Sequence, residues 1–414
     1  MCHVGDFEEG QLGKTIAIIG GGPAGLMAAE ILSAKGAAVT IYERKATAGR
    51  KFLMAGRGGL NLTHSEDITT FIEKYGVQAP LLGPVVRAYT PQMLRDWCEG
   101  LGEITFVGTS GRVFPKRFKA SPLLRAWIGR LEAQGVQFAM NHDWLGWDDD
   151  ALLFKTADGN LRVKADATLL ALGGASWPRL GADGTWVEIL AQAGVDVALL
   201  LPANCGFHVA WSPLFSAKFA GQPLKAVNAT FKGKSIIGDI MMTAQGIEGG
   251  AIYALSSVLR DAITLEGPVT LQIDLKPDLG LAAVIERLSR PRGRESVANH
   301  LRKSLGLSPV AIGLLMENPD RQNFSTYPPL RMAQLIKQHT LRLDAPFDIA
   351  RAISSAGGVK FTSVDAHFML IKKPGVFVAG EMMDWEAPTG GYLLQGTFAT
   401  AVQAAQGIED FLFG

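Results

Sequence analysis

A glycine-rich turn lies between two short apolar segments near the start of the chain. The apolar run 15–19 leads directly into Gly20-Gly21-Gly22-Pro23-Ala24-Gly25, and a second apolar run, 39–42, ends on Glu43. Gly20 permits a tight turn, Gly22 lets the backbone approach a pyrophosphate, and Gly25 lets the following helix pack closely on the strand. A pyrophosphate bound there lies at the N-terminus of that helix, where free N–H groups and the dipole favour anions. The pattern predicts a dinucleotide-binding βαβ unit.

The distance between the turn and the following acidic residue supports this interpretation. Glu43 lies eighteen residues after Gly25, beyond an expected helix over 24–35. Glu43 is placed to accept hydrogen bonds from the ribose hydroxyls of an adenosine, with Arg44 beside it. A bare match of this glycine spacing also occurs in ordinary turns, but strand, helix and acid in this order favour binding. The motif alone is compatible with NAD, NADP or FAD.

A second apolar strand ends on a pair of glycines. Residues 167–172 are apolar apart from Thr168, and Ala171 is followed closely by Gly173 and Gly174. Taken alone, this pattern fits a simple strand-to-turn junction, because glycine often ends a strand. Together with the N-terminal unit, it resembles the second signature of flavoproteins.

A third strand, near the C-terminus, favours FAD over NAD. The apolar run 376–379 is followed by Gly380, Glu381 and, three residues further on, Asp384. An aspartate here can accept hydrogen bonds from ribityl hydroxyls, which a nicotinamide cofactor lacks. The segment 388–392 then precedes the last helix, whose N-terminus would stabilise negative charge at the pyrimidine edge of a flavin.

The loop 49–64 is rich in glycine and cations. Its residues that could contact phosphates or ring edges through side chain or backbone are Arg50, Lys51, Gly58, Gly59 and Asn61. The alternative is a solvated, flexible loop. His64, at the end of the loop, could act as an acid or base, but a hydrogen-bonding role is favoured.

Composition limits the kinds of partner. The 414 residues carry a net charge of +1, so no overall field attracts nucleic acid or an acidic membrane surface. The three cysteines, Cys2, Cys98 and Cys205, form no dithiol motif, which favours a reducing cytoplasm. The acidic N-terminus has no apolar signal core, and no segment is apolar enough to span a membrane. The histidines show no metal-ligand spacing, so no metal site is expected.

The order of strand-like and helical segments predicts an α/β fold in which one domain interrupts another. We expect a Rossmann-like FAD-binding domain of the ββα nucleotide-binding type, formed by residues 1–194 and 351–414. Residues 195–350 should form an inserted mixed β-barrel and helical domain that binds or covers the substrate. Within it we expect strands over 205–210, 225–231 and 269–273, and helices over 281–288, 310–316 and 332–339. The last helix of the chain is expected over 398–411.

These segments together resemble a bacterial family of NAD(P)/FAD-dependent oxidoreductases of the BaiN/RdsA and YhiN type, which is related to aminoacetone oxidase. The similarity covers nearly the whole chain and is most specific in two stretches, GRKFLMAGRGGLNLTHSE at 49–66 and VAGEMMDWEAPTGGYLLQ at 378–395. The resemblance implies FAD bound noncovalently between the N-terminal and C-terminal segments. It also implies cofactor contacts at Gly391, Tyr392 and Leu393. A further contact, with the adenine, is implied at Trp144, which is expected to end the strand after Gly135.

The chain departs from the family pattern where substrate and flavin are expected. It has GRGGLN where the family has GGGRCN, Leu393 where TGGYN ends in asparagine, and TAQGIEGG at 243–250 in place of THFGISGP. These departures suggest a distinct branch, so a substrate cannot be transferred from named members.

The sequence therefore predicts an FAD-dependent oxidoreductase that transfers a hydride between a small organic substrate and noncovalent FAD, with NAD(P)H as one option for the electron donor. One alternative is an oxidase of an aminoacetone-like amine that passes electrons to O₂. Another is a flavin-binding sensor without turnover, with RNA contacts through the arginine-rich run 287–302. A solvated surface is favoured for that run, so a nucleic-acid partner is not expected. No side chain is identified as catalytic, and the oligomeric state is not predicted.

Overall fold

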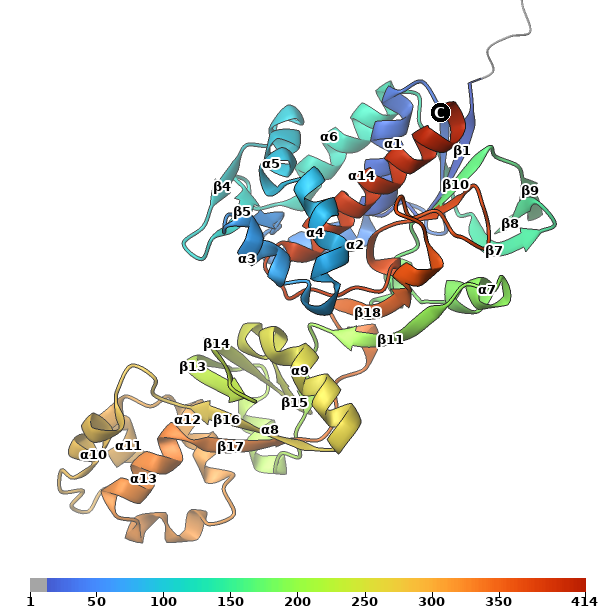
Figure 1. The fold of residues 1–414 in the computed structure, drawn as a ribbon. Helices are drawn as coiled ribbons and strands as arrows, with labels where there is room; N and C mark the ends of the chain where they lie inside the picture. Colours follow the sequence, from blue (N-terminus) through green and yellow to red (C-terminus); the bar gives the residue numbers. More distant parts are fainter. Residues whose placement is uncertain (1–12) are drawn as a thin grey trace, which may run out of the picture. The chain divides into compact units, whose positions relative to one another are not determined.

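The computed structural model describes residues 13–414, without the side chain of Arg57. The expectation of no signal peptide concerns residues outside this described range, and Cys2 also lies outside it. The chain divides into two compact units (Figure 1). Of the described residues, unit 1 comprises 13–201 together with 354–414, and unit 2 comprises 202–353. The domain borders expected from the sequence are 194/195 and 350/351.

Unit 1 is an α/β structure. Its strands are β1 (Thr15–Ile19), β2 (Ala38–Glu43), β3 (Thr63–His64), β4 (Thr105–Val107), β5 (Arg112–Pro115), β6 (Gln137–Met140), β7 (Asp143–Asp148), β8 (Ala151–Thr156), β9 (Gly159–Val163), β10 (Ala167–Leu170), β11 (Val197–Ala203), β18 (Ser354–Val359) and β19 (Val376–Val378). Its helices are α1 (Pro23–Ala34), α2 (Arg50–Ala55), α3 (Ile68–Glu73), α4 (Ala79–Ala88), α5 (Pro91–Gly100), α6 (Ala120–Ala133), α7 (Trp186–Gln192) and α14 (Tyr392–Phe413). Short 3₁₀ turns are η1 (Gly56–Gly58), η2 (Gly76–Gln78), η3 (Pro178–Leu180), η6 (Phe361–Ser363) and η7 (Gly380–Met382).

The centre of unit 1 is a parallel sheet in the order β19-β10-β1-β2-β6. Its inner strands are buried almost throughout, as expected for a parallel sheet covered by helices. Smaller sheets join β3, β5 and β4, then β7, β8 and β9, and finally β11 and β18.

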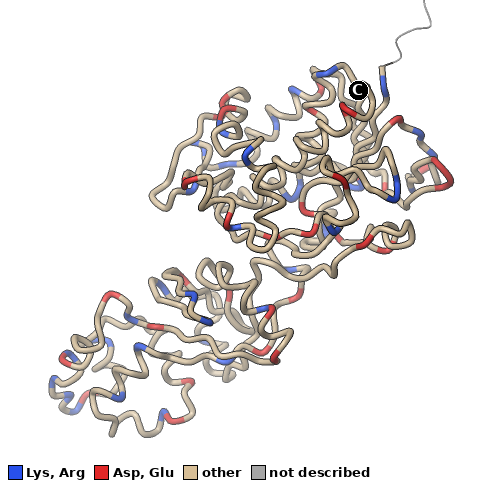
Figure 2. Tube along the Cα trace, viewed as in Figure 1, with Lys and Arg blue, Asp and Glu red and all other residues tan. Residues whose placement is uncertain are grey.

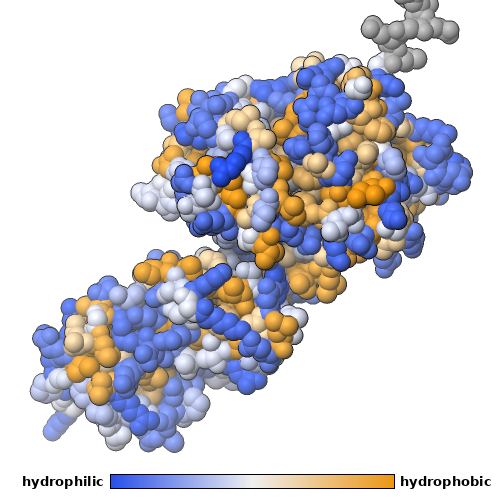
Figure 3. Space-filling view, in the orientation of Figure 1, coloured by the Kyte–Doolittle hydropathy of each residue, from blue (hydrophilic) through white to orange (hydrophobic). Residues whose placement is uncertain are grey.

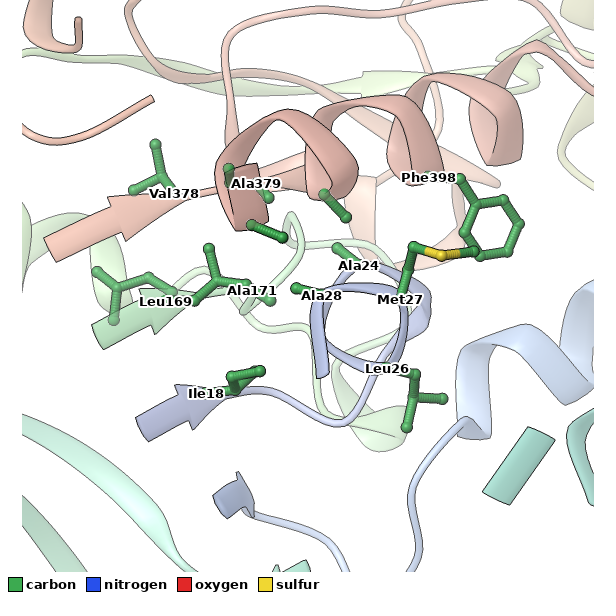
Figure 4. Packing of buried hydrophobic residues seen from close by; sticks show 14 of the residues in the cluster. Ile18, Ala24, Leu26, Met27, Ala28, Leu169, Ala171, Val378, Ala379 and Phe398 are labelled. Carbon is green, nitrogen blue, oxygen red and sulfur yellow. The ribbon is translucent and has the colours of Figure 1, made fainter. Parts of the chain in front are cut away.

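Helix α1 packs beside the long helix α14, and both helices contact strands of the parallel sheet. Pro23 occupies its first turn, where a missing N–H costs nothing. Small and unbranched residues then let the helix approach its neighbours closely, and Figure 4 shows Ala24, Met27 and Ala28 directed towards Ala379 and Phe398. The packing fixes the start of α1 against the ends of three parallel strands.

Unit 2 combines an antiparallel sheet with helices. Its elements are β12 (Phe207–His208), α8 (Pro213–Phe219), β13 (Pro223–Phe231), β14 (Lys234–Thr243), β15 (Gly246–Glu248), α9 (Gly250–Glu266), β16 (Val269–Asp274), α10 (Leu281–Leu288), α11 (Val297–Leu305), α12 (Pro309–Met316), η4 (Arg321–Thr326), α13 (Pro329–Lys337), β17 (His339–Leu343) and η5 (Ile349–Arg351). The strand order is β12-β15-β14-β13-β16-β17. His208 at the first strand also bonds to the backbone of Asp344 and Ala345, just after the last strand, so the sheet closes in the manner of a small barrel.

Several expected element borders are wrong. The helix expected over 332–339 ends at Lys337, and His339 begins β17, where alternating burial reflects the two-residue period of a strand. Burial of the His339 imidazole lowers its pKa to about 4. The strand expected over 205–210 contains only Phe207 and His208, and the last helix begins at Tyr392 instead of Phe398.

The surfaces of both units are mixed in character. Figure 2 shows basic and acidic residues interspersed along the chain, and Figure 3 shows hydrophilic and hydrophobic residues alternating over the visible faces. No helix within residues 13–414 combines the length and the apolar character needed to cross a bilayer.

Candidate functional site

The loops that the sequence singled out meet at one edge of the central sheet. Because β1, β2, β10 and β19 run in parallel, their carboxyl ends lie together, at Ile19, Glu43, Leu170 and Val378. In open sheets of this type, ligands bind outside the carboxyl ends of the strands. We call this place the carboxyl edge.

The first loop, residues 20–25, contains glycines of two kinds. A Cβ on Gly20, whose φ is +112°, would lie 2.3 Å from the Ala171 carbonyl oxygen, and one on Gly25 would lie 2.0 Å from the Gly20 oxygen. A Cβ on Gly22 would have no neighbour within 4 Å. The protein's own packing therefore requires Gly20 and Gly25, whereas Gly22 leaves open space before the N-terminus of α1.

Glu43 holds the first loop in place. One carboxylate oxygen accepts a hydrogen bond from the Gly21 N–H and the other from the Lys45 N–H, each at 2.8 Å. Burial raises the pKa of this carboxyl group. Each oxygen retains a second lone pair, so Glu43 can still accept hydroxyl donors.

Arg44 is occupied by protein partners. Its Nε lies 3.2 Å from an Asp143 carboxylate oxygen, and its Nη1 pairs with Asp183. Asp143 begins β7 and Asp183 follows η3, so Arg44 ties two segments of unit 1 to the end of β2. Its side chain acts first as a structural link.

Trp144 does not lie where the sequence analysis set it. It belongs to β7, whereas the strand after Gly135 is β6 and ends at Met140. The turn 141–142 separates these two strands, so the prediction of one continuous strand ending at Trp144 is wrong. The Trp144 side chain is buried, and its Nε1 has no hydrogen-bond partner within residues 13–414.

Helix α2 and the loop after it leave further polar atoms unpaired. Buried Nε of Arg50 and buried Oδ1 of Asn61 have no partner in the described part of the chain. A Cβ on Gly58 would meet nothing within 4 Å, while one on Gly59 would lie 2.9 Å from the Phe118 ring. A buried polar atom without a partner is costly, so Arg50 and Asn61 favour a ligand that would satisfy them.

A hydrogen-bonded bridge joins α2 to the C-terminal segment. The Lys51 ammonium lies 2.7 Å from Glu381 and donates to the Ser176 hydroxyl at 2.6 Å. The other Glu381 oxygen accepts from the Ser355 N–H at 2.9 Å, and the Ser355 hydroxyl accepts from the Ala175 N–H at 2.9 Å. We call Lys51, Glu381 and Ser355 the bridge. The sequence identified Lys51 and Glu381 as cofactor contacts but not that they bind each other.

The turn that follows β10, at residues 171–174, contacts both the first loop and the bridge. The Ala171 N–H donates to the Ile19 oxygen, which continues the pairing of β1 and β10. Gly173 has φ of +72°, and a Cβ on Gly174 would lie 2.4 Å from the Ser355 hydroxyl. The glycine pair therefore lets β18 approach this turn, which the sequence did not predict because Ser355 carries no motif.

Asp384 differs from the residues of the bridge. Gly380, with φ of +78°, lets the chain turn beside Ala24, and the Asp384 N–H donates to the Val359 oxygen. The Asp384 side chain is half-buried, and no hydrogen bond or ion pair within residues 13–414 reaches its carboxylate. Burial raises its pKa. An anchored backbone and a free carboxylate suit an acceptor for ligand hydroxyls.

The start of α14 packs on the loop after α2. A Cβ on Gly391 would lie 2.4 Å from the Thr63 carbonyl carbon, so only glycine fits there. The Tyr392 hydroxyl donates to Glu66 at 2.5 Å, and its ring lies against His64 and Phe71. Burial and the Glu66 hydrogen bond raise the pKa of Tyr392. The Tyr392 side chain is thus engaged by protein, while the first N–H groups of α14, including that of Leu393, lack intrahelical acceptors.

His64 has a hydrogen-bonding role in this structure. Its Nε2 lies 2.9 Å from the Ser110 oxygen, and its Nδ1 accepts from the Glu66 N–H at 3.2 Å. Both ring nitrogens are therefore engaged by the protein.

The chain is similar to several known proteins. The family described as HI0933-like protein Rossmann domain matches residues 14–407. The 3-dehydro-bile acid delta(4,6)-reductase of Clostridium scindens is 27% identical and covers 95% of this chain and 99% of its own length. The ribosomal RNA dihydrouridine synthase of Escherichia coli K12 is 23% identical, and the match covers 94% of this chain and 96% of the relative's length.

A solved structure shares the fold. The 3-ketosteroid-delta4-(5alpha)-dehydrogenase of Rhodococcus jostii, solved with 4-androstene-3,17-dione, matches with a TM-score of 0.51 at 14% identity, covering 98% of both chains. The expected fold class, a Rossmann-like FAD-binding domain with an inserted mixed domain, is confirmed.

Proposed function

The chain belongs to the HI0933-like Rossmann domain family, and from this premise we propose that it is an FAD-dependent oxidoreductase acting on an organic substrate. The observation that carries the proposal is the set of unfilled positions at the carboxyl edge. Gly22 leaves space before a helix N-terminus, and Asp384 has a carboxylate without a partner. Arg50 and Asn61 each have a buried polar atom without a partner.

These residues fit an adenine dinucleotide of flavin. The N-terminus of α1 beside Gly22 would bind the pyrophosphate, and Glu43 would accept the adenosine ribose hydroxyls. Asp384 would accept the ribityl hydroxyls. The unpaired atoms of Arg50 and Asn61, and the N–H groups of Leu393 and its neighbours, would bind the polar edge of the ring. Framework and ligand contacts are therefore supplied largely by different residues of the same motifs, while Glu43 serves both.

The reaction depends on orientation and charge. FAD, when bound, supplies two-electron redox chemistry, because its ring can accept or donate a hydride. The positive end of α14 would stabilise negative charge at the pyrimidine edge, and the bridge would hold α2 and η7 fixed around the ring. His64 does not need to move a proton in this scheme, since both of its nitrogens are already bonded.

Substrate and electron donor are further parts of the proposal. The relative from Clostridium scindens is named a reductase, which favours reduction of the substrate, with NADH or NADPH as the source of electrons. As expected for the inserted domain, we propose that unit 2 selects the substrate. The buried Cys98 of unit 1 forms no disulfide within residues 13–414, which suits a reducing cytoplasm.

A second candidate is reduction of a base in RNA. Two relatives are named ribosomal RNA dihydrouridine synthases, and unit 2 exposes Arg290 and Arg294, which form no ion pair within residues 13–414. An RNA substrate would make binding strongly salt-dependent, which a small neutral substrate would not. The low net charge and the sequence expectation favour the small substrate.

Anaerobic mixing of the purified protein with candidate donors tests the function. Bleaching of the flavin absorbance by NADH or NADPH supports the reductase. Bleaching by aminoacetone or another amine, with reoxidation by O₂, supports the oxidase instead. A flavin that none of these bleaches favours a binding or sensor protein, and a protein that purifies without flavin and does not bind added FAD contradicts the proposal.

A further inference from the structure

Unit 1 contains a pocket of about 460 Å³ that lies outside the set of residues assigned to the cofactor. Its walls come from two stretches, 64–68 and 87–95, which include the end of α4 and the first turn of α5. Neither the first loop, nor the bridge, nor Asp384 contributes to its lining. The volume is within the roughly 300–1,000 Å³ that small-molecule sites occupy.

One wall carries positive charge without a protein partner. Arg87 is exposed, and its guanidinium makes no hydrogen bond or ion pair within residues 13–414. Arg95 is held in position, since its Nε donates to the Thr105 hydroxyl at 3.0 Å and its Nη1 to the Gln92 side-chain oxygen at 3.3 Å. A guanidinium has five N–H donors, so Arg95 keeps several for a ligand. A positioned arginine of this kind binds carboxylates and phosphates well.

The acidic residue of the pocket does not cancel this charge. Glu66 accepts the Tyr392 hydroxyl at 2.5 Å, and it lies 3.9 Å from the Lys74 ammonium and 3.7 Å from His64 Nδ1. Lys74, which directly follows α3, therefore offsets the negative charge of Glu66, and the positive charges of Arg87 and Arg95 remain in excess.

The rest of the lining is apolar or already bonded. Ile68 and Pro91 offer hydrocarbon surface, and Pro91 has no N–H to donate. Both nitrogens of His64 are occupied, so its ring offers mainly a flat face. Thr90 caps α5 through a hydrogen bond from the Met93 N–H, and the positive end of that helix favours an anion nearby. A cationic wall beside an apolar wall favours a ligand that has both a negative charge and an apolar group.

We propose that this pocket is a second ligand site, which binds a small organic anion: a carboxylate carried on an apolar group. The carboxylate would lie between Arg87 and Arg95, and the apolar group against Ile68 and Pro91. The site needs no flavin, so the proposal stands or fails independently of the function proposed above.

Calorimetric titration with benzoate tests the site, at constant ionic strength and on the full chain as purified. We expect saturable binding of one benzoate per chain. Benzamide has the same shape without the charge and should bind at least about tenfold more weakly, since it loses the charge-assisted bonds to arginine. Inorganic phosphate should bind more weakly than benzoate, because it leaves the apolar wall unused.

Two variants locate the binding. Arg87→Gln and Arg95→Gln should each weaken benzoate binding by about tenfold. Arg125→Gln removes an equally exposed charge from α6 and should change nothing. Arg87 makes no protein contact through its guanidinium, so its variant remains informative even if Arg95→Gln fails to fold. Benzoate that does not saturate, benzamide that binds equally well, or unchanged affinity in the Arg87 variant would overturn the proposal.

Discussion

The first loop and the bridge lie at the same edge of the same sheet, but they use their residues in opposite ways. The bridge satisfies its own polar groups, because Glu381 accepts from both Lys51 and Ser355. The first loop leaves open space at Gly22, where a Cβ would meet no protein atom within 4 Å. The difference teaches that a cofactor motif contains two classes of residue: those that build the framework and those that leave room. Substitution should separate the classes by whether folding or FAD binding suffers.

The largest effect is expected at the framework glycine of the first loop. Gly25→Ala would place a Cβ 2.0 Å from the Gly20 oxygen, where neither backbone can give way. We expect the free energy of unfolding to fall by about 3 kcal/mol or more, measured by denaturant titration of the apoprotein. Gly129→Ala is the matched control, because a Cβ in that helix meets nothing within 4 Å. It should stabilise by roughly 0.5–1 kcal/mol. Equal stability of the two variants would break the comparison.

The bridge should be the next most sensitive place. Glu381→Ala leaves the Lys51 ammonium and the Ser355 N–H without their acceptor, in a partly buried setting. The expected loss is about 2 kcal/mol of unfolding free energy, with or without FAD.

The surface pair of Lys35 and Glu409 is the control for the bridge. The two groups are 2.9 Å apart, but the Lys35 side chain is 56% exposed. Glu409→Ala should therefore cost less than about 1 kcal/mol. If both glutamate variants lose the same stability, the bridge is an ordinary surface contact.

Asp384 should show the reverse behaviour. Asp384→Asn keeps the shape of the side chain and disturbs no protein hydrogen bond. We expect FAD affinity to fall by roughly three- to tenfold through weaker bonds to the ribityl hydroxyls, measured by flavin fluorescence during titration of the apoprotein. The exposed Asp158→Asn should bind FAD as the unmodified protein does. Unchanged affinity in the Asp384 variant would remove this residue from the site.

The smallest effect concerns the pH dependence of the apoprotein. Burial outweighs the attraction of Lys360 and, with a smaller contribution from repulsion by Glu386, holds the pKa of Asp384 above its value in the unfolded chain. Between the raised pKa of the folded state and the ordinary value of 3.8, the folded state binds more protons than the unfolded chain. The contribution of Asp384 to stability therefore rises as the pH falls towards 3.8. Relative to Asp384→Asn, the unmodified protein should gain stability on acidification, as followed by thermal unfolding at several pH values. A difference that does not vary with pH would mean that the carboxylate is effectively solvated.

Sequence was sufficient where the backbone itself determines the chemistry. The separate roles of Gly20, Gly22 and Gly25 follow from strand, turn and helix in succession, and their surroundings agree with those roles. The parallel strands could be recognised because their apolar runs are nearly unbroken. That the loops bind FAD stays a prediction.

Sequence was insufficient where a side chain has a choice of partner. Lys51 and Glu381 are 330 positions apart, and nothing in either segment indicates that they pair. Ser355 carries no motif, so its contact with Gly174 could not be foreseen. Trp144 was assigned to the wrong strand because the turn after Met140 has no glycine or proline to mark it. Tertiary contacts decide such cases.

The most direct test of the central claim is an FAD titration of the apoprotein beside its Gly22→Ala variant. A Cβ at Gly22 meets no protein atom, and its φ of −84° suits alanine, so the variant should fold with unchanged stability. The account predicts stoichiometric binding of one FAD by the unmodified chain and at least about tenfold weaker binding by the variant, since the new methyl group occupies the pyrophosphate's place. Equal FAD affinity of the two proteins, or no saturable binding by either, would contradict it.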